Sequence, residues 1–83
     1  MQKNILIVDD DLRLRELLKD YLTEKKLDVY VCDDFDNARE IIQYFIFDLI
    51  ILDRMMPSGD GIKLVSTIKK ISTTPVVMLT AMG

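Results

Sequence analysis

Aspartates follow two of the apolar runs in this sequence, and their type and spacing suggest metal chemistry. Asp9 and Asp10 come directly after the run 5–8, and Asp53 ends the run 49–52. Two unit charges about 4 Å apart repel by roughly 4 kcal/mol at an effective dielectric constant near 20, so neighbouring carboxylates need a cation. Mg²⁺ prefers oxygen ligands and usually keeps several waters. Three carboxylates brought together would therefore make a magnesium site.

A carboxylate beside Mg²⁺ at an exposed strand end can also attack phosphorus and form an acyl phosphate. We assign that nucleophilic role to Asp53. Thr80 ends the last apolar run, where its hydroxyl is expected to hydrogen-bond a phosphoryl oxygen, and the small Ala81 leaves room for the group. The structural alternative for each acid is a turn or a helix cap, and for Asp11 we favour the cap.

The elements that must position these residues alternate along the chain. Amphipathic stretches with the spacing of one helical face separate four short apolar runs, of which 28–32 alternates as an edge strand does. Residues 55–61 contain one proline and two glycines and are expected to form a loop. The helical stripes are Leu14, Leu17, Leu18, Tyr21 and Leu22; then Phe35, Ala38, Ile41, Ile42 and Phe45; then Ile62, Val65 and Ile68 with either Leu64 or Ile71.

The resulting order βαβαβαβ predicts an α/β fold with a parallel sheet and helices on both faces. Sites in such folds lie at the carboxyl ends of the strands. The runs that end at Asp9 and Asp53 therefore place their carboxylates on the same rim of the sheet.

Composition excludes several kinds of function. The 83 residues allow one domain, the net charge of −3 argues against nucleic acid as a direct partner, and no apolar run approaches the roughly 18–20 residues that span a bilayer. The sequence has no histidine, which excludes Ser-His-Asp and Cys-His triads and zinc held by histidine. The single cysteine, Cys32, is interpreted as a packing residue at a strand end and fits a reducing compartment. A cytoplasmic location is expected.

Three motifs resemble those of the CheY-like receiver domains of two-component response regulators. Residues 5–11 resemble the first strand with its acidic pair, residues 48–61 the phosphoacceptor strand and loop, and residues 75–81 the strand that carries the switch threonine. The loop is similar to that of OmpR-type transcriptional regulators. The resemblance covers essentially the whole chain.

The resemblance implies a three-layer, doubly wound, flavodoxin-like fold with strand order 2-1-3-4. It makes Asp53 the phosphoacceptor, Thr80 the switch hydroxyl and Ala81 the small residue beside it. Asp10 would bind Mg²⁺ directly, and Asp9 would help to bind it through water. The implied metal ligands are thus Asp9, Asp10, Asp53 and the backbone carbonyl of Met55.

The partner that the resemblance implies is a sensor histidine kinase, whose phosphohistidine supplies the phosphoryl group, and the implied output is transcription regulation. An enzyme is not expected. Aspartyl phosphohydrolases of the dehalogenase-like kind have a second acid two residues after the nucleophile, whereas Asp53 is followed by Arg54 and Met55.

Receiver domains continue past this point with a fourth helix, a fifth strand that begins after a Lys-Pro pair, and a fifth helix. Residues 1–83 are therefore expected to be the N-terminal part of a receiver domain, truncated before those elements. The alternative function is a fragment that cannot be phosphorylated and acts only in protein interaction or dimerisation.

Such a truncation would leave residues 76–79 as an edge strand with unpaired backbone groups. Three helices would also leave part of one sheet face bare near the third and fourth strands, and apolar patches of this kind usually mark interfaces. A homodimer that pairs through this edge and this face is therefore expected, rather than a stable monomer.

Overall fold

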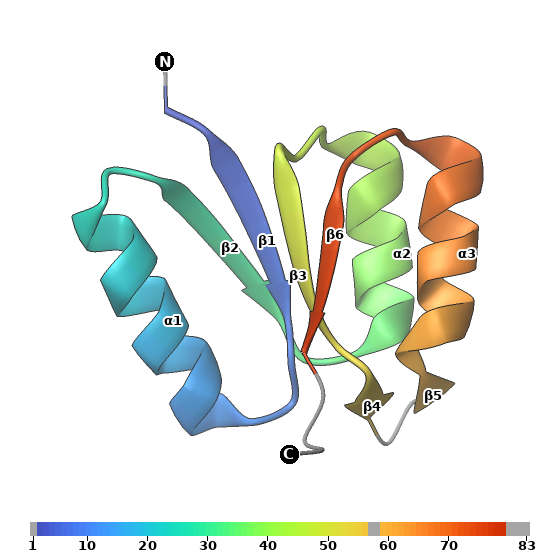
Figure 1. Ribbon diagram of the computed structural model, residues 1–83, viewed down its shortest axis with the longest axis horizontal. Coiled ribbons are helices and arrows are strands. Elements are labelled where there is room, and N and C mark those ends of the chain that lie inside the picture. Colours follow the sequence, from blue (N-terminus) through green and yellow to red (C-terminus); the bar gives the residue numbers. More distant parts are fainter. Residues whose placement is uncertain (1, 57–58, 80–83) are drawn as a thin grey trace.

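The computed structural model describes residues 2–56 and 59–79 and contains one four-stranded parallel sheet (Figure 1). Its strands lie in the order β2-β1-β3-β6, which confirms the order 2-1-3-4 predicted for the four apolar runs. The strands of this sheet are β1 (Asn4–Val8), β2 (Asp28–Cys32), β3 (Leu49–Asp53) and β6 (Val76–Leu79). The helices are α1 (Leu12–Glu24), α2 (Phe35–Tyr44) and α3 (Gly61–Ile71).

The helices form a layer on each side of the sheet. Figure 1 shows α1 on one face and α2 with α3 on the other, which is the doubly wound arrangement expected from the alternating pattern. In the register of the sheet, Val8 lies beside Cys32 on one side and Leu52 on the other. The carboxyl ends of the strands therefore lie together and form one rim of the sheet.

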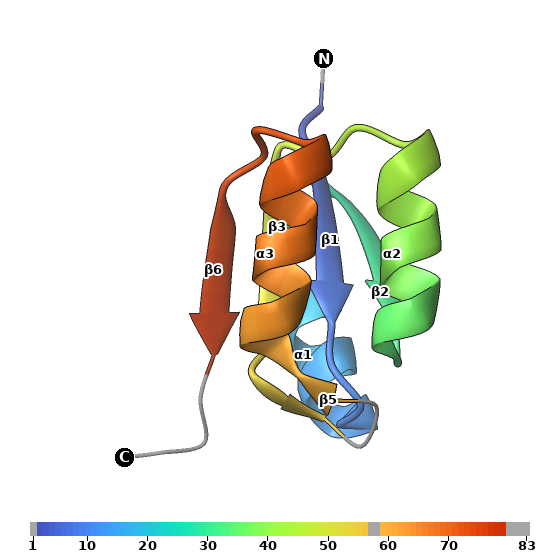
Figure 2. The same ribbon diagram turned by 90° about the vertical axis from the view of Figure 1, so that its right-hand side faces the viewer.

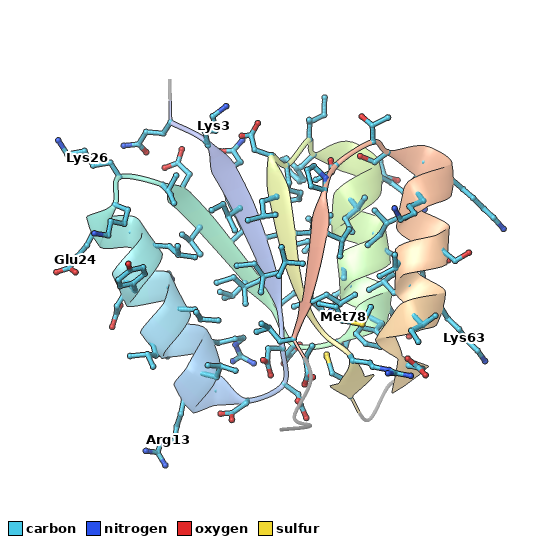
Figure 3. All side chains as sticks on the ribbon, in the orientation of Figure 1. Lys3, Arg13, Glu24, Lys26, Lys63 and Met78 are labelled. Carbon is cyan, nitrogen blue, oxygen red and sulfur yellow. The ribbon has the colours of Figure 1, made fainter. Side chains whose placement is uncertain are left out.

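The main hydrophobic core lies between the sheet and the α2–α3 layer. Alternate residues of a strand point to opposite faces, so Leu6 and Val8 of β1 and Ile50 and Leu52 of β3 enter this core together. Each of these side chains is fully buried. Met78 of β6 is directed to the same layer (Figure 3) and packs at the edge of the core. The helices contribute Phe35, Ala38, Ile42, Leu64 and Ile68.

Some of the predicted helical stripes are wrong in detail. Phe45 was expected in the core, but α2 ends at Tyr44, and Phe45 is exposed while Phe47 is buried. In α3, Leu64 rather than Ile62 faces the core, and Ile71 is half-exposed. These residues lie near helix ends, where the chain direction changes and the helical period no longer decides which face a side chain joins.

The segment that was predicted as a loop contains a short antiparallel pair. β4 (Met55–Met56) pairs with β5 (Gly59–Asp60), and the pair follows β3 directly. Met56 is buried against the core. This pairing holds the connection close to the end of β3, so the loop is more regular than its proline and glycines suggested.

The face that α1 covers is less well packed than the other. The helix α1 has no buried residue, and Leu17 and Tyr21, which were expected to face the sheet, are exposed. On β6 the side chain of Val77 is 48% exposed. Figure 2 shows β6 at the outer edge of the sheet. The open edge and the partly bare face are thus as predicted for the described residues, and the homodimer stays a prediction.

The longest helix within residues 2–56 and 59–79 has 13 residues. A helix needs about 20 to cross a bilayer, and none of the described helices is a candidate span.

Candidate metal centre and phosphoacceptor site

Asp9 is a buried carboxylate at the end of β1. Its backbone N–H donates to the carbonyl of Cys32 at 3.1 Å, which continues the ladder between β1 and β2 by one residue. Only 2% of Asp9 is exposed. The Oδ1 atom accepts a hydrogen bond from the N–H of Asp11 at 2.8 Å, and the backbone carbonyl accepts one from Arg15 Nη1 at 2.9 Å. Asp9 is therefore held from both its side chain and its backbone.

Asp53 is the last residue of β3 and is half-buried. It lies beside Leu79 in the register with β6, and the N–H of Arg54 donates to the carbonyl of Leu79 at 2.9 Å. The carboxylate is thus positioned by a central strand that pairs with β1 as far as Leu52 and with β6 as far as Asp53.

The three predicted ligand carboxylates come together at this rim. One carboxylate oxygen from each of Asp9, Asp10 and Asp53 lies within 4.8 Å of the other two. Asp9 is buried, Asp53 is intermediate and Asp10 is exposed, so the cluster opens from the sheet toward solvent. Oxygen donors at this separation suit a small hard cation such as Mg²⁺, which is commonly bound through one or two carboxylates and several waters.

The electrostatics of the cluster favour a cation as well. Burial raises the pKa of Asp9, the hydrogen bond from Asp11 lowers it, and the neighbouring charges of Asp53 and Asp10 raise it again. A raised pKa means that the ionised form of Asp9 is disfavoured in the folded chain. A bound cation would offset both the burial and the repulsion, because its charge has the opposite sign.

Asp11 lies outside this cluster of ligand oxygens and caps α1. Its side chain accepts hydrogen bonds from the N–H groups of Arg13 and Leu14, at 3.0 and 3.2 Å. This satisfies two of the N–H groups that every helix leaves unpaired at its start. The assignment of Asp11 as the cap of α1 is confirmed.

Gly61 packs against the backbone that follows Asp53. A Cβ atom at Gly61 would lie 3.0 Å from both the Cα and the carbonyl oxygen of Arg54, and 3.1 Å from the carbonyl oxygen of Asp53. The N–H of Gly61 donates to the carbonyl of Arg54, and Arg54 Nε lies 3.7 Å from Asp60 Oδ1. The start of α3 is thereby joined to the end of β3.

Two residues at the site were not identified from the sequence. Arg15 was not singled out, since nothing in its position within α1 indicates that it reaches the backbone of Asp9. Gly61 was noted only as a loop residue, although a glycine next to a helix start can signal close backbone approach. Met55 lies in β4, two residues after Asp53 along the chain. Thr80 and Ala81, predicted for the same rim, lie outside the described residues.

Comparison with known proteins identifies the family. Residues 5–83 match the response regulator receiver domain. The chain belongs to this family. As a receiver domain it is 41% identical over 85 residues to the transcriptional regulatory protein ResD of Bacillus subtilis, and 37% identical over 83 residues to the transcriptional regulatory protein SrrA of Staphylococcus aureus. These alignments cover 99% and 100% of the chain but 34% of each relative, so the chain spans about a third of their length.

Solved structures of receiver domains have the same fold. The response regulator TrrA of Thermotoga maritima is 32% identical, with a TM-score of 0.91 over 99% of this chain and 72% of TrrA. It was solved in complex with Mg²⁺ and BeF, and also with the histidine kinase ThkA. A two-component response regulator from Clostridium difficile gives a TM-score of 0.94 at 32% identity, over 99% of this chain and 68% of that one. The flavodoxin-like fold inferred from the motifs is therefore confirmed.

Proposed function

We propose that this receiver domain accepts a phosphoryl group from the phosphohistidine of a sensor histidine kinase onto Asp53, with Mg²⁺ bound at the rim. The observation that carries the proposal is the cluster of Asp9, Asp10 and Asp53, whose ligand oxygens lie within 4.8 Å of one another at the carboxyl ends of β1 and β3. Three carboxylates this close repel one another unless a cation neutralises them, and they surround Asp53 with negative charge. The chemistry of such a cluster suits transfer of an anionic group.

In the proposed reaction, a carboxylate oxygen of Asp53 attacks the phosphorus atom and forms the new P–O bond. The P–N bond to the kinase histidine breaks, and its electron pair returns to the imidazole. Bound Mg²⁺ would neutralise charge on the phosphoryl oxygens and the carboxylates. Asp9, Asp10 and Asp53 would hold it, with the Met55 carbonyl as the further ligand.

The other residues of the site act by positioning. The hydrogen bonds from Asp11 and Arg15 fix the side chain and the carbonyl of Asp9. The contact of Gly61 with Arg54 fixes the backbone after Asp53. Groups held in place by such contacts lower the reorganisation that accompanies transfer. On this basis Thr80 would donate a hydrogen bond to a phosphoryl oxygen and Ala81 would leave space for it.

Partners and output follow from the relatives. TrrA was solved with a histidine kinase, which supports a kinase as the phosphoryl donor here. ResD and SrrA are transcriptional regulatory proteins, which supports transcription regulation as the output, with any DNA contact made outside this segment. In this role the domain is phosphorylated rather than turning over a substrate as an enzyme does, and it would act in the cytoplasm.

The test is phosphorylation of the full-length protein by a small donor such as acetyl phosphate in the presence of Mg²⁺. Intact-mass measurement should show one added phosphoryl group, which is lost on treatment with hydroxylamine because an acyl phosphate is labile to it. Asp53→Asn should abolish the adduct. Asp48→Asn is a matched control, since Asp48 directly precedes the same strand at its other end and accepts a hydrogen bond from the N–H of Asn4.

An adduct that persists in Asp53→Asn would contradict the assignment. A wild-type protein that folds and binds Mg²⁺ but takes no phosphoryl group would favour the alternative, an interaction module without phosphotransfer.

A further inference from the structure

The strand β2 is the edge of the sheet opposite to β6. The N–H of Asp28 donates to the carbonyl of Lys3 at 2.9 Å, and the carbonyl of Cys32 accepts from Asp9. In a parallel pair, alternate residues of a strand direct both backbone groups to the same neighbour. The backbone N–H and carbonyl groups of residues 28, 30 and 32 are therefore directed to β1. Those of Val29 and Val31 are directed to the open edge.

An apolar surface accompanies this edge on the α2 side. Tyr30, Phe45 and Ile46 are 52%, 64% and 87% exposed, although all three are large hydrophobic residues. Two adjoining hollows, of ≈ 520 and ≈ 250 Å³, both have Val31, Ile41 and Phe45 in their walls. The ring of Tyr30 is held edge-on against Phe47 with centroids 5.8 Å apart. The edge thus combines outward-directed backbone groups with a groove that is apolar around Tyr30, Phe45 and Ile46 and has Asp33 and Glu40 in the wall of its larger hollow.

Opposite charges flank the strand at its two ends. Lys25 and Lys26 precede β2, and Asp33 and Asp34 follow it. Lys26 is directed away from the molecule at the turn before β2 (Figure 3). In antiparallel pairing with a second copy, Lys26 of one strand would lie beside the acidic end of the other, while Asp28 adds one acid at the start of each strand. The strand is therefore complementary to itself.

We propose that this chain forms a two-fold dimer by antiparallel pairing of β2 with β2 of a second copy, centred on Tyr30. This register places Val29 opposite Val31 twice, so the outward-directed groups of β2 in both copies are paired. It places the two Tyr30 rings side by side and Lys26 of each copy beside the Asp33–Asp34 end of the other. One patch that serves both copies is what a two-fold interface requires.

In this dimer, apolar side chains of one copy also lie beside the groove of the other. Asn4 and Ile46 line the hollow at the start of β2, because Asn4 pairs with Asp28. The end of the second copy's β2 lies at that place in the antiparallel dimer. The exposed Phe45 and Ile46 of one copy are thereby brought beside the hollow at Cys32 of the other. Aromatic and branched pairs across strands stabilise sheets in this way.

The opposite edge, β6, at which the sequence predicted the homodimer, lacks this self-complementarity, so the pairing is assigned to β2 instead. β6 is preceded by Thr74 and Pro75 and has no charged residue within Val76–Leu79. The two edges can therefore be distinguished by substitution. Val77→Lys serves as the control for β6, since Val77 is half-exposed on the face that α1 covers.

The test is the dimer dissociation constant of the purified protein, measured by sedimentation equilibrium from micromolar to millimolar concentration. Tyr30→Lys should raise the constant by about tenfold or more, because it sets two like charges opposite each other at the centre of the pair. Lys26→Glu alone should raise it by about threefold to tenfold. Val77→Lys should leave it within about twofold. Circular dichroism confirms that each variant is folded.

A second test exchanges the charges at positions 26 and 33. Lys26→Glu combined with Asp33→Lys should recover part of the loss and lower the constant by about threefold relative to Lys26→Glu alone, because the new cation at position 33 lies beside the new carboxylate at position 26 of the other copy, while Asp34 remains opposite it. Asp33 is used because Asp34 caps α2 by accepting from the N–H of Asn37 at 2.7 Å. A wild-type protein that is monomeric throughout overturns the proposal. So does a dimer that survives Tyr30→Lys, is lost in Val77→Lys, or is equally weak in the single and double charge variants.

Discussion

At the scale of single residues, three consecutive acids have three different surroundings. Asp9 is buried and held by hydrogen bonds, Asp10 is exposed within the ligand cluster, and Asp11 caps a helix. The change from strand to helix occurs within these residues, so each carboxylate points in a different direction. If the helix began one residue earlier, Asp10, a candidate metal ligand, would take the cap position of Asp11.

Because Asp10 and Asp11 have different surroundings, replacing each by alanine is predicted to change a different property of the protein. Asp10→Ala should weaken Mg²⁺ binding by about tenfold or more, because it removes a charged oxygen ligand, with little effect on metal-free stability. Asp11→Ala should lower the free energy of unfolding by about 0.5–2 kcal/mol through loss of the cap, and leave Mg²⁺ affinity nearly unchanged. Titration calorimetry and urea unfolding measure the two quantities. Equal losses of Mg²⁺ affinity would show that the roles overlap.

Site residues can be predicted from the sequence when a local pattern, such as the end of an apolar run, marks their position. Asp9, Asp10 and Asp53 could be assigned because each ends an apolar run, and parallel strands bring their ends together. Arg15 could not, because its hydrogen bond to Asp9 depends on how the α1 helix returns across the sheet. Long-range contacts of this kind leave no periodic pattern in the chain.

At the scale of elements, the start of α3 is joined to the end of β3 by close backbone contact. Gly61 allows this approach through its missing side chain, since an added Cβ would lie 3.0 Å from backbone atoms of Arg54. Asp60 caps the helix by accepting from the N–H of Ile62 at 2.9 Å. The start of α3 is therefore held against the end of β3.

Gly61→Ala should therefore disturb both elements. The atoms that its Cβ would meet belong to the backbone, so they cannot rotate away, and we expect a loss of about 1–3 kcal/mol in the free energy of unfolding. Phosphorylation of Asp53 should slow as well, because the carboxylate is displaced. Ser66→Ala, at an exposed position of the same helix, is the control and should stay within about 0.5 kcal/mol of the wild type. A fully active, equally stable Gly61→Ala would refute the role of close contact.

The prediction of core residues from periodicity succeeded in the middle of α2, failed at its end, and failed within α1, where Leu17 and Tyr21 are exposed. Ala38 and Ile42 of α2 are buried as their spacing indicates. Phe45 continues the same spacing but follows the last residue of the helix, and the buried aromatic residue is Phe47 instead. A run of apolar residues after a helix does not reveal which of them turns inward, because that depends on the path of the next connection.

At the scale of the whole molecule, the two faces of the sheet contribute unequally to stability. The α2–α3 side contains the contiguous core, whereas α1 has no buried residue and leaves Val77 half-exposed. Ile5 and Ile7 are the well-buried side chains of β1 that lie outside the core cluster, on the α1 side. A chain of this size has a small margin of stability, so the packed face should carry most of it.

Adjacent isoleucines of β3 provide a matched test of this inequality. Ile50 is fully buried in the α2–α3 core, and Ile51, the next residue, faces the α1 side and is half-buried. Ile50→Ala should lower the free energy of unfolding by about 2–5 kcal/mol, since it leaves a cavity among packed neighbours. Ile51→Ala removes the same atoms from a site that solvent already reaches, so its cost should be less than half as large. Urea unfolding of the two variants at the same protein concentration compares them directly. Similar losses would mean that the α1 face is packed in solution, either by a second copy or by a closer approach of α1.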